Sequence, residues 1–169
     1  MSSSPASPRP GRDAAVEQAP VAPRRILVPI DFSDHSKYAL AYASRTAVAF
    51  GSELILLYVV EPAVYPADLG FGQVSLPNIE RELTERAGAE LKELAAAHAG
   101  PVRSVRTLVR TGRPFIEILE TARSERVDLI VIATHGHTGV EHLLFGSTTE
   151  KVVKKAHCPV LIVRQMHER

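Results

Sequence analysis

The feature that most constrains the fold of this chain is the stretch of residues 128–150, which joins an apolar run to a glycine-bearing loop and a helix start. Its apolar run, Leu129 to Ile132, is typical of a strand buried on both faces of a parallel sheet. Ser147 and Glu150 have the spacing of a capping box, which predicts a helix that begins at Ser147 with this serine as its N-cap. Backbone N–H groups and the positive end of a helix dipole then lie at the carboxyl edge of a sheet, where anions bind. We therefore predict a phosphate site.

Composition favours one globular domain preceded by a tail. The chain has 169 residues, 45% hydrophobic and 23% charged, which suffices for one core of ordinary size. Residues 1–23 are rich in proline and serine and almost without large apolar side chains. We therefore expect a disordered N-terminal tail over residues 1–23 and a single domain over residues 24–169. A transit peptide is the alternative for the tail.

Charge and hydropathy argue against several protein classes. The net charge is +1 with basic and acidic residues interspersed, so we expect no binding to nucleic acid. The longest apolar run of the predicted core, residues 54–60, is too short to span a membrane. Cys158 is the only cysteine, which excludes an internal disulfide and suits a reducing compartment. With no visible secretory signal, the expected location is the cytoplasm.

Strand and helix signals alternate along the domain. The predicted strands cover residues 26–31, 53–60, 102–109, 129–132 and 159–163, and the predicted helices start near Ser33, Asn78, Pro114 and Ser147. Ser33 and Asn78 are expected N-caps, and Gly51 is expected to close the first helix. One apolar stripe of the second helix comprises Ile79, Leu83, Ala87, Leu91, Leu94 and Ala95. The proline- and glycine-rich residues 61–77 form a long connection and a candidate lid.

This alternation predicts an α/β fold, with a doubly wound five-stranded parallel sheet and helices on both faces. In such sheets, ligands bind outside the carboxyl ends of the strands where the strand order reverses, here between the first and fourth strands. Asp31 ends the first strand, and the glycine loop follows the fourth. The two should therefore meet.

Four separated motifs resemble those of the universal stress protein family. They are ILVPIDFS at residues 26–33, LLYV at 56–59, ATHG at 133–136 followed by nine residues and Gly146-Ser147, and CPVLIV at 158–163. The resemblance covers residues 24–164 and implies a sheet of order 3-2-1-4-5 in a protein that is usually dimeric. The ATP-binding branch of the family carries G-x2-G-x9-G-[ST] at the fourth strand. This chain departs from that motif at its first glycine, which is Ala133.

The resemblance also implies which residues hold ATP. It places the phosphates against Gly136, Gly146, Ser147 and Thr148, after the strand end at Ala133, and it places Pro29, Ile30, Asp31 and the backbone of Val59 around the ribose and adenine. The residues themselves favour the same site, because glycines allow a close approach while the Ser147 hydroxyl and successive N–H groups donate to oxygens. Mg²⁺ is expected with a triphosphate. The alternatives are turn residues for Gly136 and Gly139, a helix cap for Ser147, and a cap or turn residue for Asp31.

Other chemically active side chains have simpler interpretations. His135, His137 and His142 lie close in sequence. A metal site needs three or four ligands that converge in space with a second shell of partners, so we expect no metal site here. Cys158 is expected to be a small buried hydrophobe and not a nucleophile. The lysines at 151, 154 and 155 could steer phosphate, although a solvated helix face is the simpler interpretation. The chain has no Walker motif, so we expect at most slow ATP hydrolysis and no dedicated enzyme activity.

The last strand suggests how the protein assembles. Val160 to Val163 are all apolar, and the predicted topology places them at a sheet edge, so we expect a homodimer through Pro159 to Val163. The predicted function is an ATP-binding stress-response regulator, in which nucleotide occupancy modulates dimer or partner interactions. The alternative is a dimeric stress interaction protein of the same fold that binds no nucleotide.

Overall fold

The computed structural model describes residues 22–62, 77–98, 100–135 and 145–165, in which strands and helices alternate. The strands are β1 (Arg25–Ile30), β2 (Glu53–Val60), β3 (Ser104–Thr111), β4 (Leu129–Ala133) and β5 (Val160–Val163). The helices are α2 (Asp34–Phe50), α3 (Pro77–His98), α4 (Pro114–Ser124) and α5 (Ser147–Lys155). The predicted tail up to residue 21, most of the candidate lid, and Gly136 with His137, Gly139 and His142 lie outside the described residues.

The five strands form one parallel sheet of order β3-β2-β1-β4-β5, which confirms the predicted fold class and strand order. Central strands have apolar residues on both faces: Ile26 and Leu27, next to each other in β1, are both fully buried and belong to different core clusters. This is why their sequences read as continuous apolar runs.

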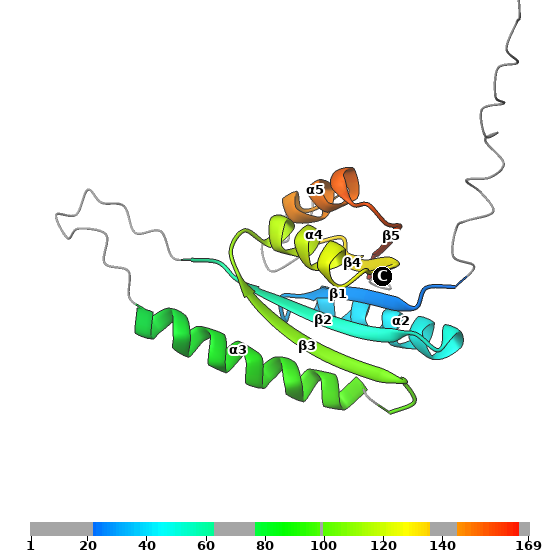
Figure 1. The fold of residues 1–169 in the computed structure, drawn as a ribbon, viewed down its shortest axis with the longest axis horizontal. Helices are drawn as coiled ribbons and strands as arrows, with labels where there is room; N and C mark the ends of the chain where they lie inside the picture. The colour runs from blue at the N-terminus through cyan, green and yellow to red at the C-terminus, as the bar shows by residue number, and fades with distance from the viewer. Residues whose placement is uncertain (1–21, 63–76, 99, 136–144, 166–169) are drawn as a thin grey trace, which may run out of the picture.

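Helices cover both faces of the sheet (Figure 1). On one face, α2 contributes Leu40 and α3 contributes Leu91 to a core cluster built on β1, β2 and β4. On the other face, α4 contributes Ile118 and α5 contributes Val152. None of the helices within the described residues combines the length and apolar character needed to cross a bilayer.

Local signals at the ends of α2 act as predicted. Ser33 is the N-cap, and its side chain accepts a hydrogen bond from the Ser36 N–H. Gly51 follows the helix with φ 66°, a left-handed conformation that glycine adopts without steric cost. Both signals are local, so the sequence alone was sufficient to read them.

Three predicted details are wrong. The N-cap of α5 is Gly146 and not Ser147, and Glu150 pairs with Lys154 (2.6 Å) instead of closing a capping box. Helix α3 begins at Pro77, so Asn78 lies inside its first turn and is not its cap. Leu83, predicted on the buried stripe of α3, is 48% exposed, whereas Ala87, Leu91 and Ala95 are buried as predicted.

Candidate functional site

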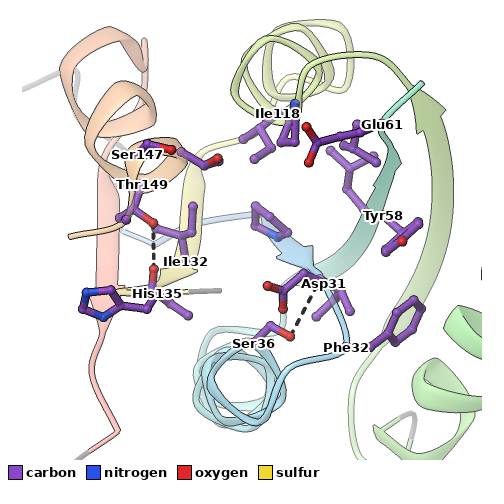
Figure 2. A pocket seen from close by; sticks show the side chains of 18 of the residues that line it. Asp31, Phe32, Ser36, Tyr58, Glu61, Ile118, Ile132, His135, Ser147 and Thr149 are labelled. Carbon is purple, nitrogen blue, oxygen red and sulfur yellow. Dashed lines mark hydrogen bonds between the residues drawn. The ribbon is translucent and has the colours of Figure 1, made fainter. Parts of the chain in front are cut away.

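A cavity of about 530 Å³ opens at the carboxyl ends of β1, β2 and β4. Its position is the point where the strand order reverses, because β1 pairs with β2 on one side and β4 on the other. Its volume falls in the range of small-molecule sites. Figure 2 shows Ser147 and Thr149 on one side of the cavity and Asp31, Tyr58 and Glu61 across from them.

The structure brings together nearly all of the residues that the sequence proposed for a binding site. Eight line the cavity: Pro29, Ile30, Asp31, Val59, Ala133, Gly146, Ser147 and Thr148. The ninth, Gly136, lies outside the described residues. Segments more than 100 residues apart in sequence therefore share one cavity.

The β4 side of the cavity presents the amino end of α5. Two hydrogen bonds fix the helix start to the strand end: the Gly146 N–H donates to the Thr134 carbonyl (2.8 Å), and the Thr149 hydroxyl donates to the Ala133 carbonyl (2.9 Å). The first N–H groups of a helix have no acceptor within the helix, and they carry the positive end of its dipole. Ser147 and Thr148 therefore offer amide donors at the cavity wall.

Gly146 is not required by the conformation of the chain. Its φ of −67° and ψ of 154° suit any residue. A Cβ built on it would lie 3.5 Å from the Thr134 carbonyl oxygen and 3.7 Å from the His135 Cα, which are ordinary contacts. The fold would accept a larger residue here, so the space that glycine leaves is available to a ligand.

Ala133, which replaces the first glycine of the family motif, fits the site without distortion. It is the last residue of β4, and among described residues other than glycine only Phe32 and Arg126 have positive φ. A glycine is therefore not needed for the backbone at this position. Ala133 is 5% exposed and lines a cavity that remains open.

The β1 side of the cavity is organised around Asp31. Its Oδ1 accepts hydrogen bonds from the Ser33 N–H (3.0 Å) and the Ser33 hydroxyl (2.5 Å), while the Ser36 hydroxyl lies 3.4 Å from the Asp31 N–H (Figure 2). The turn role suggested for aspartate is thus present. Ser33 caps α2 and orients this carboxylate at the same time, so the helix start and the cavity wall depend on each other.

An aromatic wall beside Asp31 was not predicted. Phe32 has φ 64°, an uncommon conformation for a bulky residue, and its ring packs on Tyr58 with centroids 4.9 Å apart. Both residues line the cavity. Phe32 lies inside a recognised motif and Tyr58 immediately precedes Val59, so the rule that ligands bind at carboxyl strand ends could have identified them.

Carboxylates make this end of the cavity acidic. Glu61 and Glu90 line it together with Asp31. Burial and then the charges of Glu90, Asp31 and Glu61 raise the pKa of Tyr58 above its usual value. The cavity therefore has opposite polarity at its two ends, with helix amides at α5 and carboxylates beside β2. Glu90 comes from the middle of α3, and no local pattern in the sequence marks it.

The histidines, the cysteine and the lysines that the sequence singled out do not form a second reactive centre within the described residues. The rings of His35 and His135 have centroids 6.4 Å apart, but no group of three potential metal ligands is found among the described residues. Cys158 is half-buried, and burial followed by the charge of Asp128 raises its thiol pKa, as suits an unreactive side chain. Lys151 and Lys155 lie over the Phe115 ring at 5.0 and 5.9 Å.

Comparison with known proteins identifies the family. The family model described as "Universal stress protein family" matches residues 23–164. A universal stress protein of Methanocaldococcus jannaschii is 34% identical over 145 residues, which cover 84% of this chain and 82% of that protein. The structure of the universal stress protein UspA from Lactobacillus plantarum has a TM-score of 0.72 at 28% identity, covering 83% of this chain and 97% of that one.

A further solved structure shares the fold and holds a ligand. It is described as a universal stress protein in complex with cAMP, with a TM-score of 0.60 over 85% of this chain and 98% of that chain. At 23% identity this likeness concerns the fold alone. The family match and the identity to the archaeal protein, together with the sheet order, lead to one conclusion: this chain belongs to the universal stress protein family.

Proposed function

We propose that this protein is an ATP-binding regulator, in which nucleotide occupancy modulates dimer or partner interactions. The observation that carries the proposal is the amino end of α5 at the cavity where the strand order reverses, which we call the switch-point cavity. Residue 146 at this helix end is a glycine, although the backbone conformation does not require one. Helix N-termini with close backbone access are sites where phosphates bind. The cavity volume is sufficient for a nucleotide.

The two ends of the cavity give the nucleotide an orientation. The triphosphate binds at the amides of Ser147 and Thr148, with Gly146 beside it, and Mg²⁺ accompanies it. Gly136, which the family resemblance places against the phosphates, lies outside the described residues. The ribose and adenine bind by Pro29, Ile30 and Asp31, with the adenine edge at the Val59 backbone. The reverse orientation would bring phosphates against Asp31, Glu61 and Glu90, which repel them.

We expect regulation and not rapid turnover. The described residues that line the cavity include neither Lys nor Arg, which are the side chains that stabilise charge on a transferring phosphoryl group. Any hydrolysis is then slow and incidental. Occupancy of the site is the signal, and the connection over residues 61–77 is a candidate to govern it.

Assembly through β5 is part of the proposal. This strand pairs with β4 on one side and ends the sheet, and its four residues are all apolar. Unpaired apolar edges invite pairing with another chain, so we expect two copies to associate along Pro159 to Val163. Sedimentation that shows only monomers at micromolar concentration would contradict this part.

A second candidate function keeps the dimer and discards the nucleotide. It is favoured by one observation, the alanine at position 133 in place of the motif glycine. In that case the protein acts only through contacts with partner proteins. The cavity and its open helix end argue for the first candidate.

Calorimetric titration with Mg-ATP separates the two. The parent protein should bind ATP with micromolar affinity, and Gly146→Trp, which fills the phosphate end, should abolish the heat signal. Gly100→Trp is the matched control, because a Cβ at Gly100 meets nothing within 4 Å. No heat from a folded parent protein would rule out nucleotide binding and favour the interaction protein.

A further inference from the structure

A second hollow lies at the opposite edge of the sheet, where the strands begin. It has a volume of about 960 Å³, and its charged lining consists of Arg24, Arg25, Arg103, Arg126, Glu53 and Asp128. Strand β2 has eight residues, so this edge is about 26 Å from the carboxyl edge that holds the first cavity. The two sites are therefore separate.

Both carboxylates of this hollow already have partners, which are backbone N–H groups for Asp128 and arginine side chains for Glu53. The Asp128 Oδ2 accepts hydrogen bonds from the backbone N–H groups of Arg24 and Arg25, both at 2.9 Å. Glu53 pairs with Arg25 (3.4 Å) and with Arg106 (2.6 Å). Neither carboxylate forms an ion pair with the side chain of Arg24, Arg103 or Arg126.

Three arginines of the hollow have no ion-pair partner among the described residues, and its lining carries more positive than negative charge. Arg24, Arg103 and Arg126 are exposed, and no ion pair or side-chain hydrogen bond within the described residues involves their guanidinium groups. The hollow has four guanidinium groups against two carboxylates. A local excess of positive charge favours an anionic ligand.

The helix ends at this edge do not explain the arginines. The carboxyl end of α4 is already served by Arg25, whose Nη1 donates to the Glu125 carbonyl (2.8 Å). At the end of α2, the Gly51 and Ser52 N–H groups donate to the Ala47 carbonyl. Arg126 has φ 51°, a conformation that glycine adopts most readily after a helix, yet the chain has an arginine there.

The arginines form a row along the edge of the sheet. Arg103 directly precedes β3, Arg24 directly precedes β1, and Arg126 comes shortly before β4. Neighbouring strands are about 4.8 Å apart, so the row from β3 to β4 spans about 14 Å in the order β3-β2-β1-β4. A row of this length suits an anion with several charged groups. Guanidinium groups match phosphate oxygens with paired N–H donors.

We propose that this arginine hollow binds a chain of phosphate groups, either inorganic polyphosphate or the phosphates of a nucleotide. The site is distinct from the switch-point cavity and does not depend on the proposed ATP function. The backbone of β1 and β4 anchors it, because Asp128 ties the start of β1 to the start of β4.

The test is an NMR titration of the full chain with inorganic tripolyphosphate, observed at the arginine Nε–Hε groups. We expect saturable shifts of Arg24, Arg103 and Arg126, with Arg45 and Arg123 unchanged. Calorimetry on the double variant Arg103→Gln/Arg126→Gln should show that its affinity for tripolyphosphate is at least about tenfold lower than that of the parent. The control Arg45→Gln/Arg123→Gln removes the same charge at exposed residues outside the hollow and should stay within about twofold.

The design separates this site from the first cavity. Calorimetry is done in a Gly146→Trp background, so that the amino end of α5 does not contribute heat, and the NMR titration of the parent protein is decisive if that variant does not fold. Equal losses in both double variants, or no saturable shift at millimolar tripolyphosphate, would overturn the proposal. Tighter binding of hexaglutamate than of tripolyphosphate would overturn the phosphate assignment. Titration with ATP then distinguishes nucleotide phosphates from inorganic ones.

Discussion

Replacement of Gly146 should separate the stability of the protein from its affinity for phosphate. Gly146 is the N-cap of α5 and provides no side-chain hydrogen bond. A serine here would accept a hydrogen bond from the amide of Thr148 or Thr149, which is the usual N-cap bond. The Cβ would meet no atom closer than 3.5 Å. Gly146→Ser should therefore raise the free energy of unfolding by a few tenths of a kcal/mol, roughly the difference between serine and glycine caps.

The same hydroxyl should weaken ATP binding, because it competes with the phosphates for the amides at the start of α5. Loss of one hydrogen bond to a charged group is worth about 1.5 to 3 kcal/mol, which corresponds to roughly 10- to 150-fold in affinity. Gly146→Ala adds a methyl group without an acceptor, so it should weaken binding less than serine while lowering stability slightly. Affinity should thus fall in the order Gly, Ala, Ser, whereas stability should be highest for Ser.

Urea unfolding and calorimetric titration with Mg-ATP measure the two quantities on the same samples. Equal ATP affinities for the parent and Gly146→Ser would refute the idea that the amides at the start of α5 hold the phosphates. A large loss of stability in Gly146→Ser would refute the claim that the fold does not require glycine there.

Three further predictions concern the surroundings of the site. Ser33→Ala removes the N-cap of α2 and the hydroxyl that bonds Asp31, so the free energy of unfolding should fall by about 1 kcal/mol and ATP should bind more weakly; Ser33→Thr should preserve both. The pKa of Tyr58 is raised in the folded state, so stability should fall as the pH rises from about 10 through that raised pKa, and urea unfolding of Tyr58→Phe should lack this part of the decline. Burial raises the pKa of Cys158, so iodoacetamide should alkylate it more slowly at pH 7.5 than a free cysteine peptide, and a faster reaction would contradict the unreactive assignment.

The fold was predictable because its signals are local and agree with one another. Strand β4 is a run of buried apolar residues, and Ser33 and Gly51 mark the two ends of α2. Alternation of such strands with helices leaves few topologies. The strand order itself came from the family resemblance and not from periodicity.

The errors arise where tertiary contacts decide. Gly146 and Ser147 are both acceptable N-caps by sequence, and the bond from Gly146 to Thr134 selects the glycine. Leu83 fits the apolar stripe of α3, but this helix of 22 residues is about 33 Å long, whereas β2 and β3 are about 26 Å. The first turns of α3 extend beyond the sheet (Figure 1), and Leu83 is exposed there.

The sequence predicted the residues of the candidate site that follow the strand ends, but not the residues that α3 and α4 contribute. Asp31 and Ser147 follow from the rule about carboxyl strand ends, which needs only the topology. Glu90 and Pro114 reach the cavity from α3 and α4, and their positions depend on how these helices pack. No pattern near them in sequence carries that information.

The placement of ATP at the start of α5 can be tested most directly by backbone amide NMR. Titration of the ¹⁵N-labelled protein with Mg-ATP should produce the largest saturable shifts at Ser147 and Thr148, with further shifts at Asp31 and Val59. Arg45, on α2 and outside the cavity lining, should be unaffected. Saturable shifts elsewhere with none at Ser147 and Thr148, or no shifts at all in the folded protein, would contradict the account.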